Sequence, residues 1–283
     1  MLTRLLMQAA DDRAERTLYS KRPRASVLTS PHRSGSVGRM VDAPSAPIVP
    51  STFASTEWRN APASSATLAA PLRIATLNVC FDPRLRRERT RALVAAIETW
   101  NADVVALQEV TLLVLASLQS SDLVRSEYHV AVGSMEATYG VVLLSRVPFT
   151  RVDQVSLPGM MGRTLLVARW GEGEGSVAVA TLVGDMNFDP GDPEERTRDL
   201  RYTDAWPALR GNDPGYTEDT DTNVLRLLAE GGEHKQVRYD RIFVRSSSMR
   251  PTHIERVGTE PFGTPFGPSG LSDHFGVLAT FDV

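Results

Sequence analysis

The sequence predicts an α/β domain, and three consecutive segments near the start of its folded part carry that prediction. Residues 72–78 alternate like a half-buried strand that ends in Asn78. Residues 86–100 place their apolar side chains at helical spacing, and residues 103–109 form a second apolar run that ends in polar residues. A strand, a helix and a strand in this order predict a β-α-β unit.

Further strands are expected along the rest of the chain. They are residues 128–132, 140–145, 164–170, 177–181, 237–244 and 275–281. The strands at 164–170 and 177–181 are joined by residues 171–175, whose glycines suit a hairpin loop. The strand at 237–244 carries an acid, Asp240, in its middle. These strands extend the β-α-β unit into a larger α/β domain.

Residues 1–70 differ from the rest of the chain in composition, because they carry clusters of Ser, Pro, Ala and Arg without a sustained apolar period. We expect a mostly disordered tail at residues 1–70 and a folded domain at residues 71–283. Residues 21–24, Lys-Arg-Pro-Arg, fit a nuclear import signal, so we expect a nuclear location. The Arg- and Ser-rich start also fits an organelle transit peptide, although its acidic residues argue against one, and a tail without a targeting signal is a further alternative.

The composition disfavours several classes of protein. No apolar run approaches the roughly 18 residues that a membrane-spanning helix needs, so we expect a soluble protein without a membrane partner. The net charge of −3 does not suggest a general polyanion binder. The single Cys80 excludes intramolecular disulfides and a Cys-rich zinc site, and it favours a reducing compartment.

A short motif, Gly184-Asp185-Met186-Asn187, follows an apolar run. On a strand end, Asp185 and Asn187 would project to the same side because they are two residues apart. A carboxylate beside an amide can hold a water and a phosphate oxygen together, which is nuclease-type chemistry. The alternative is an ordinary turn, in which the same residue types are common.

Two further polar candidates stand at the carboxyl ends of the first two strands. Asn78 ends the first and Glu109 ends the second, where sheets of this kind place ligands. Glu109 is our candidate for holding Mg²⁺, since that ion prefers one or two carboxylates together with waters and a substrate phosphate. The alternative for Glu109 is a surface acid at a strand end.

The Ser272-Asp273-His274 sequence near the C-terminus supplies a candidate cation. If Asp240 pairs with one ring nitrogen of His274, it raises the pKa of the imidazole and fixes its tautomer. The alternatives are a simple turn for Ser-Asp-His, and a surface ion pair of Asp240 with Arg238 or Arg241.

These candidates together suit hydrolysis of a phosphodiester. Asp185 would take a proton from the attacking water while Asn187 orients it. A metal ion and a cationic His274 would face the developing negative charge. The sequence contains neither a Gly-x-Ser-x-Gly elbow nor a GxxxxGK[ST] phosphate loop, which disfavours a serine hydrolase and a P-loop enzyme.

Four motifs in this order resemble the endonuclease/exonuclease/phosphatase superfamily. They are TLN at 76–78, LQE at 107–109, GDMN at 184–187 and SDH at 272–274, and the resemblance covers about residues 72–283. It implies a DNase I-like, four-layer α/β sandwich of two mixed β-sheets flanked by helices. It also implies Mg²⁺, with Mn²⁺ as an alternative, at Glu109 with support from Asp273.

Within that superfamily the chain is similar to the branch that hydrolyses 5′-phosphotyrosyl-DNA bonds. The segments that carry this likeness are 160–163, 204–206, 215–217, 221–223 and 238–243. The implied partner is a DNA 5′ end that bears a phosphotyrosyl adduct left by a trapped topoisomerase. The resemblance implies these roles: Asn78, Asp185 and Asn187 bind water and phosphate, Asp240 and His274 form a stabilising pair, and Trp206, Tyr216 and Asn223 contact the substrate. The alternatives are another nuclease or phosphatase of the superfamily, and a non-catalytic binding remnant.

Two departures from that branch matter. Asp189 stands where the branch usually carries an Arg close to the scissile phosphate. In addition, the branch inserts a His-bearing motif and a helix before the GDxN strand, whereas here Thr181 runs directly into Leu182.

The second departure amounts to roughly thirty missing residues, judged from one helix, its loops and part of a strand. We expect a register fault: either the 171–175 hairpin pairs and Asp185 is misplaced, or Asp185 reaches the site and the hairpin is pulled out of alignment. Losing the second active-site His would cost about 10²- to 10³-fold in rate. We therefore expect an impaired enzyme, with a skipped exon or a faulty gene model as the origin.

Overall fold

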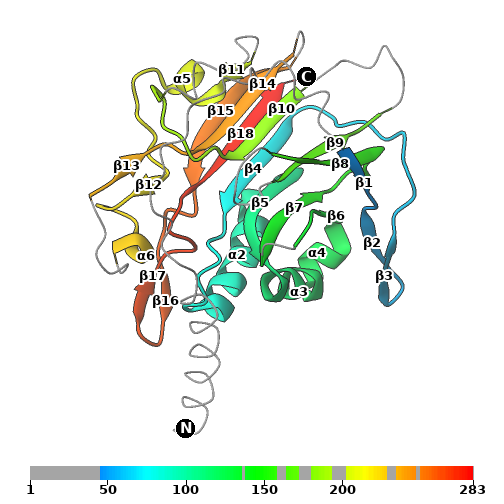
Figure 1. Cartoon of the computed structure of the whole chain (residues 1–283), viewed down its shortest axis with the longest axis horizontal. Coiled ribbons are helices and arrows are strands. Elements are labelled where there is room, and N and C mark those ends of the chain that lie inside the picture. Colours follow the sequence, from blue (N-terminus) through cyan, green and yellow to red (C-terminus); the bar gives the residue numbers. More distant parts are fainter. Residues whose placement is uncertain are drawn as a thin grey trace, which may run out of the picture.

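A computed structural model describes residues 45–135, 138–157, 164–171, 180–192, 202–227, 234–246 and 249–282. Its centre is an eight-stranded sheet in the order β15-β18-β4-β5-β7-β6-β2-β3 (Figure 1). The strands are β2 (Ser51–Ala54), β3 (Glu57–Asn60), β4 (Leu72–Asn78), β5 (Val104–Thr111), β6 (His129–Val132), β7 (Tyr139–Ser145), β15 (Arg250–Val257) and β18 (Gly276–Asp282). Only the β4–β5 pair is parallel, so the sheet is mixed.

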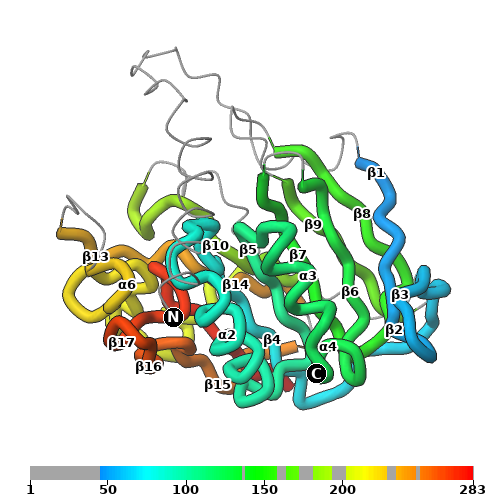
Figure 2. The backbone as a smooth tube through the Cα atoms, turned by 90° about the horizontal axis from the view of Figure 1, so that it is seen from below, coloured from blue at the N-terminus to red at the C-terminus, as the bar shows by residue number. Residues whose placement is uncertain are grey.

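The predicted β-α-β unit is present. Helix α2 (Arg86–Trp100) has the predicted bounds and connects β4 to the parallel strand β5. It packs Leu93, Ile97 and Trp100 into the main hydrophobic core. Helices α3 (Leu112–Ser120) and α4 (Asp122–Glu127) lie with α2 over the same face of the large sheet (Figure 2).

The other face of the large sheet carries a second layer of strands. One sheet is β10 (Ala180–Asp185), β14 (Asp240–Arg245) and β11 (Thr203–Asp204), and another is β1 (Ser45–Ile48), β8 (Arg151–Ser156) and β9 (Thr164–Arg169). All of their pairings are antiparallel. Two hydrophobic clusters, one under each small sheet, pack this layer on the large sheet.

The α/β sandwich expected from the resemblance is therefore confirmed, with two differences. Among the described strands, only the large sheet contains a parallel pair, and β9 and β10 of the second layer lie in different sheets. Among the described residues, its helical cover is the short α5 (Ala205–Arg210), which packs against β14 and β15.

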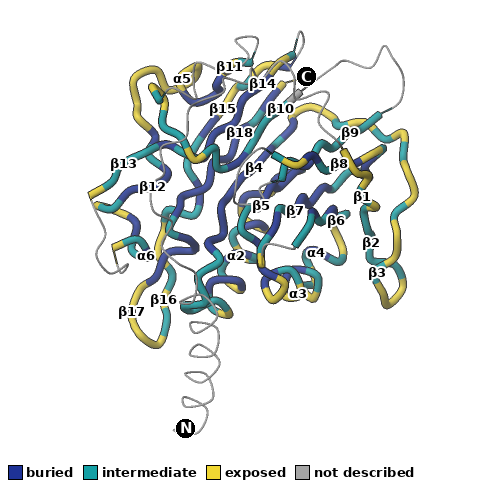
Figure 3. The backbone as a smooth tube through the Cα atoms, viewed as in Figure 1, coloured by how far each residue is buried: buried dark blue, intermediate teal, exposed yellow. Residues whose placement is uncertain are grey.

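Strand β4 is buried on both faces, although the alternation of residues 72–78 predicted a half-buried strand. Six of its seven residues are buried, and Arg73 is intermediate (Figure 3). The helices cover one face and the second strand layer covers the other, so alternation in the sequence did not report an exposed face.

The ordered domain begins earlier than predicted. Strands β1, β2 and β3 lie within residues 1–70, where we expected a disordered tail, so that expectation is wrong from Ser45 on. Each strand has four residues, too few for a visible period, and each is held by pairing: β1 with β8, β2 with β6, and β3 with β2. Residues 1–44, including the 21–24 segment, lie outside the described residues.

The predicted hairpin at 171–175 and most of its second strand lie outside the described residues, as do residues 160–163. The flanking strands nevertheless show where Asp185 lies. β9 pairs with β8, whereas β10 pairs with β14 and aligns Asp185 with Asp240. Asp185 therefore reaches the strand end beside Asp240, whereas the pairing of the hairpin itself lies outside the described residues.

The remaining described elements lie together at the left of Figure 1. They are β12 (Glu218–Asp219), α6 (Val224–Leu227), β13 (Gln236–Val237), and the hairpin of β16 (Phe262–Thr264) and β17 (Gly267–Ser269). The strand predicted at 237–244 is in fact two elements, and β14 begins at Asp240, so this acid lies at a strand end. Among the described residues, no helix has the length and apolarity to cross a membrane.

Candidate active site

The ends of β4 and β10 meet across the two strand layers. Asn78 Nδ2 donates to Asp185 Oδ2 at 3.0 Å, and Asn78 Oδ1 accepts from the Cys80 amide at 2.9 Å. The other Asp185 oxygen, Oδ1, accepts from the backbone amide of Asn187 at 2.9 Å. The carboxylate of Asp185 is thus held at a fixed place by one side-chain donor and one backbone donor.

Asp240 and His274 form the second pair of the site. His274 Nδ1 lies 2.7 Å from Asp240 Oδ2, and Asp240 is fully buried. Arg238 and Arg241 instead bind the carboxylate of Asp204. The alternative of a surface pair for Asp240 is therefore wrong, and the predicted Asp240–His274 pair is present.

Two side-chain hydroxyls hold the backbone of Asp240 and of His274 in place. Thr217 Oγ1 accepts from the amides of Tyr239 and Asp240, each at 3.0 Å. Ser272 Oγ accepts from the His274 amide at 3.2 Å, so the predicted turn also exists. The turn and the ion pair are both present in His274: the turn holds its backbone amide, and the ion pair holds its imidazole ring.

Charge in this network favours a cationic imidazole beside a basic carboxylate. Burial by itself would lower the pKa of His274, but the Asp240 carboxylate outweighs it, helped by Asp185 and Asp273, and raises the pKa to about 10. Burial, with the nearby Asp240, raises the pKa of Asp185 above its usual value. At neutral pH His274 therefore carries a positive charge, and Asp185 is a stronger base than an exposed carboxylate.

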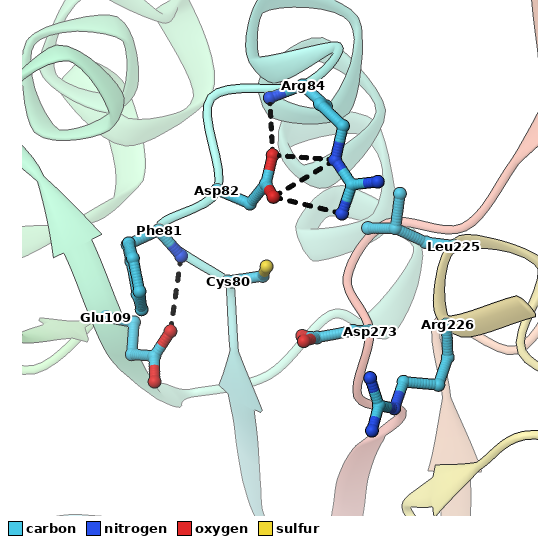
Figure 4. A pocket seen from close by; sticks show the side chains of 8 residues that line it. All are labelled: Cys80, Phe81, Asp82, Arg84, Glu109, Leu225, Arg226 and Asp273. Carbon is cyan, nitrogen blue, oxygen red and sulfur yellow. Dashed lines mark hydrogen bonds and ion pairs between the residues drawn. The ribbon is translucent and has the colours of Figure 1, made fainter. Parts of the chain in front are cut away.

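A hollow of about 240 Å³ lies beside this network (Figure 4). Its walls are Cys80, Phe81, Asp82, Arg84, Glu109, Leu225, Arg226 and Asp273. Glu109 approaches it from β5 and Asp273 from the turn that precedes β18, and the Phe81 amide donates to Glu109 Oε2 at 3.2 Å. Glu109 sits at a positive φ of 57°, where β5 is irregular between Leu107 and Val110, and this turns it from the regular strand direction.

The hollow fits a divalent cation of the Mg²⁺ type. Burial raises the pKa of Glu109, and the Asp273 carboxylate adds to the effect, while hydrogen bonds from Asn78 and Phe81 lower it. Two carboxylates that repel each other in a partly buried space would be stabilised by a cation between them. Among the described residues, no group of three or more His, Cys, Asp or Glu side chains could hold a metal, so waters and substrate phosphate would complete the coordination, as Mg²⁺ prefers.

Asn187 departs from the predicted geometry. β10 ends at Asp185, and Asn187 follows in an exposed turn with a φ of 56°. The rule that residues two apart share a strand face therefore does not apply to it. Its side-chain amide lies 3.5 Å from the Asp185 carbonyl oxygen, close to the Asp185 carboxylate that it was expected to assist.

The three predicted substrate contacts have different surroundings. Trp206 is only 5% exposed, packs under Gly215 and donates through Nε1 to the Asp213 carbonyl, so little of its ring is free to stack on a base, although it lines the same hollow as Tyr216. Tyr216 is half-buried and lines a second hollow of about 190 Å³ with Asp189.

Asn223 is fully buried, so direct contact with a substrate is wrong for this side chain. Its Oδ1 accepts from the amides of Leu225 and Arg226 at the start of α6, and its Nδ2 donates to the Ser272 carbonyl. Asn223 therefore supports the Ser272–His274 turn from behind.

His274 stands alone among the described histidines in this network. His129 lies in β6, His234 contacts Asp221, and His253 contacts Glu255. Within the described residues, none of the three replaces the second histidine expected from the resemblance.

Sequence reasoning did not single out Thr217 or Arg89. Thr217 belongs to the Gly-Tyr-Thr segment but was not assigned a role. Arg89 precedes Leu93 by four residues and Ile97 by eight, so it lies on the buried stripe of α2. A charged residue on the apolar face of a helix indicates a buried side chain with polar partners, so the sequence could have identified Arg89.

The site and the fold can now be compared with known proteins. A model of the Endonuclease/Exonuclease/phosphatase family matches residues 75–274. The chain belongs to this family. This match confirms the resemblance to the superfamily that was drawn from the four motifs. No curated protein sequence matches the chain.

Solved structures of family members have the same fold. TDP2 of D. rerio, complexed with a single-strand DNA product, is 20% identical with a TM-score of 0.59, over 76% of this chain and 100% of that one. Truncated TDP2 of Caenorhabditis elegans is 20% identical with a TM-score of 0.63, over 76% and 98%. The Bacteroides thetaiotaomicron mannosyl-6-phosphatase Bt3783 is 15% identical with a TM-score of 0.52, over 75% and 100%. At these identities the likeness shows a shared fold.

Proposed function

We propose that this family member is a Mg²⁺-dependent phosphodiesterase of the tyrosyl-DNA type, with weakened turnover. Its substrate would be a DNA 5′ end that carries a phosphotyrosyl adduct. The observation that carries the proposal is the convergence of two hydrogen-bonded pairs, Asn78–Asp185 and Asp240–His274, at the aligned ends of β10 and β14 beside the Glu109–Asp273 hollow.

The residues divide the chemistry between them. Asp185, whose pKa is raised by burial, would accept a proton from the attacking water. His274 stays cationic through Asp240 and would stabilise the negative charge that develops on the phosphate oxygens. Asn78 holds the Asp185 carboxylate in position to accept this proton.

Glu109 and Asp273 would hold the divalent ion, with Mn²⁺ as an alternative to Mg²⁺. The bound ion would polarise the phosphate and neutralise part of its charge. The Phe81 amide and Asn78 orient the Glu109 carboxylate toward the hollow.

Weak turnover follows from what the described site lacks. It holds one histidine, His274, and an acid, Asp189, near Arg238, where the branch usually places a cation. A missing donor to the phosphate typically costs about 10²- to 10³-fold in rate. We therefore propose that the chain binds its substrate and metal but hydrolyses slowly.

A 5′-phosphotyrosyl oligonucleotide tests the proposal directly. Purified protein should release tyrosine with Mg²⁺ or Mn²⁺ and stop when EDTA is added. An Asp185→Asn variant is the matched control, because it keeps the size of the side chain and one of its two accepted hydrogen bonds but removes the base. Turnover that is equal in EDTA, or equal in Asp185→Asn, would remove the idea.

A second candidate is a phosphatase or nuclease that acts on another phosphoester. The buried Trp206 favours it, because the expected stacking surface is reduced, and a sugar phosphatase shares the fold. A panel of sugar phosphates, unmodified DNA and phosphotyrosyl DNA separates the two candidates. Binding of DNA without turnover of any substrate would instead support a non-catalytic remnant.

We also propose a nuclear location, on the basis of residues 21–24 and of the proposed DNA substrate. A fluorescent fusion should accumulate in nuclei and lose that accumulation when residues 1–44, which precede strand β1, are deleted. Accumulation in an organelle, or an unchanged distribution after deletion, contradicts it.

A further inference from the structure

Arg89 is a buried cation whose guanidinium donates to backbone carbonyl oxygens. Its side chain is in the first turn of α2, and the residue is 3% exposed. The guanidinium donates to five carbonyl oxygens: Leu271 from Nε at 3.0 Å, Asp82 and Arg84 from Nη1 at 3.0 and 3.3 Å, and Val79 and Cys80 from Nη2 at 2.5 and 2.6 Å. This number of acceptors compensates the removal of a charged group from water.

Four of these acceptors belong to the loop that forms one wall of the Glu109 hollow. Phe81 lies between Cys80 and Asp82, and its amide donates to Glu109 Oε2. The loop also contains unfavourable backbone, since Cys80 and, at its end, Leu85 have φ values of 59° and 53°. A loop with two left-handed residues other than glycine needs contacts that hold it, and Arg89 supplies them.

The fifth acceptor belongs to the opposite wall. Leu271 precedes Asp273 by two residues, and Asp273 faces the same hollow (Figure 4). One rigid guanidinium therefore ties the loop that orients Glu109 to the turn that carries Asp273. Its planar set of donors allows five carbonyls to be bound from one group, which the three donors of a lysine ammonium cannot reproduce.

We propose that Arg89 is a positioning residue of the divalent-metal site and fixes the spacing between the Glu109 and Asp273 carboxylates. This inference rests on the proposed function, because it assumes that these two carboxylates hold the ion. Arg89 touches neither substrate nor metal. It acts through the backbone of both walls, as supporting residues do in metal sites.

Mn²⁺ binding, followed by the electron paramagnetic resonance of the free ion, gives a readout that does not depend on turnover. Arg89→Lys should weaken Mn²⁺ affinity about 10- to 100-fold. Turnover of Arg89→Lys should recover toward the unmodified rate at saturating Mn²⁺. Ile97→Ala is the matched control: it removes a fully buried side chain from the same helix and should lower the melting temperature with Mn²⁺ affinity unchanged.

Amide hydrogen exchange of the unmodified chain tests the same point even where Arg89→Lys fails to fold. Mn²⁺ should slow exchange in the 79–84 and 271–273 segments together, since one side chain joins them. Exchange slowed in only one of the two segments, or Mn²⁺ affinity unchanged in a folded Arg89→Lys, overturns the positioning role. An unmodified chain that binds no Mn²⁺ overturns the metal site itself, and with it the proposed function.

Discussion

The side-chain amide of Asn78 donates a 3.0 Å hydrogen bond to the carboxylate of Asp185 across 107 residues of sequence. The bond joins the large sheet to the second strand layer, because Asn78 ends β4 and Asp185 ends β10. It shows that β10 reaches the site although Thr181 runs directly into Leu182. Among the described strands of the second layer, β9 and β10 lie in different sheets.

Replacing Asn78 with alanine should reduce turnover by about 10²-fold, comparable to the loss of one catalytic hydrogen-bond donor. The Asp185 carboxylate would lose its side-chain donor, and an unsatisfied buried group costs about 1–3 kcal/mol of stability. Rates on the best substrate of the panel and urea unfolding measure the two effects. Thr76→Val on the same strand is the control, because it removes a buried hydroxyl bonded to Gln108 and should cost stability but little rate. Equal rate losses in both variants would mean that Asn78 acts only through folding.

Stability should depend on pH through His274. Its folded pKa is about 10, above the ordinary value of about 6.5, so the folded state binds the proton more tightly. The stabilisation is therefore fully present below pH ~6.5 and is lost as the pH rises through about 10, with a slope of up to about 1.4 kcal/mol per pH unit. The melting temperature should fall across that window.

Asp240→Asn tests the cause of this pH dependence, because it removes the carboxylate that raises the pKa of His274. The variant should melt with a weaker dependence on pH between about 6.5 and 10. His253→Gln changes an exposed histidine and should retain the unmodified profile. A flat profile in the unmodified chain would show that His274 titrates near its ordinary pKa.

Glu109→Gln should weaken Mg²⁺ and Mn²⁺ binding, because the amide keeps the shape of the side chain but removes a ligand charge. Asp82→Asn alters another carboxylate of the same hollow, one that is paired with Arg84, and should leave metal affinity nearly unchanged. Isothermal titration of both variants measures the difference. Equal weakening would indicate that overall negative charge, and not a specific ligand, attracts the ion.

Replacing Trp206 and replacing Tyr216 should have different effects on stability and on DNA affinity. Trp206→Ala removes a buried ring and should cost about 3–5 kcal/mol of stability. Tyr216→Ala should barely change stability but weaken single-strand DNA binding, since a stacked aromatic ring contributes about 1–3 kcal/mol per base. Chemical denaturation and fluorescence anisotropy distinguish the two. Unchanged DNA affinity in Tyr216→Ala would exclude the second hollow from the substrate path.

The transcript should encode additional residues between Thr181 and Leu182. A crossover from one strand through a helix to the next needs a dozen or more residues, and we expect roughly thirty. Sequencing the messenger RNA checks this expectation, and a protein with the longer segment should hydrolyse its substrate faster and melt at a higher temperature. A messenger that encodes the junction as given, together with full turnover of the short protein, would contradict it.

The sequence by itself determined the β-α-β unit, the bounds of α2 and the identity of the polar residues at the strand ends. It could do so because these features are local: apolar spacing of 3.6 or 2 defines helices and strands, and polar residues interrupt it where strands end. The Asp240–His274 pair was also expected, because Asp240 interrupts a predicted strand and the resemblance to the superfamily implies this pair.

Tertiary structure alone decided the features that depend on distant segments. Strands β1 to β3 are too short to show a period and exist because β6 and β8 supply partners. Trp206 and Asn223 became buried because other segments pack over them. Arg89 gained its role only where the 79–84 loop and the Leu271 turn meet, because hydrogen bonds across 182 residues leave no mark in local sequence.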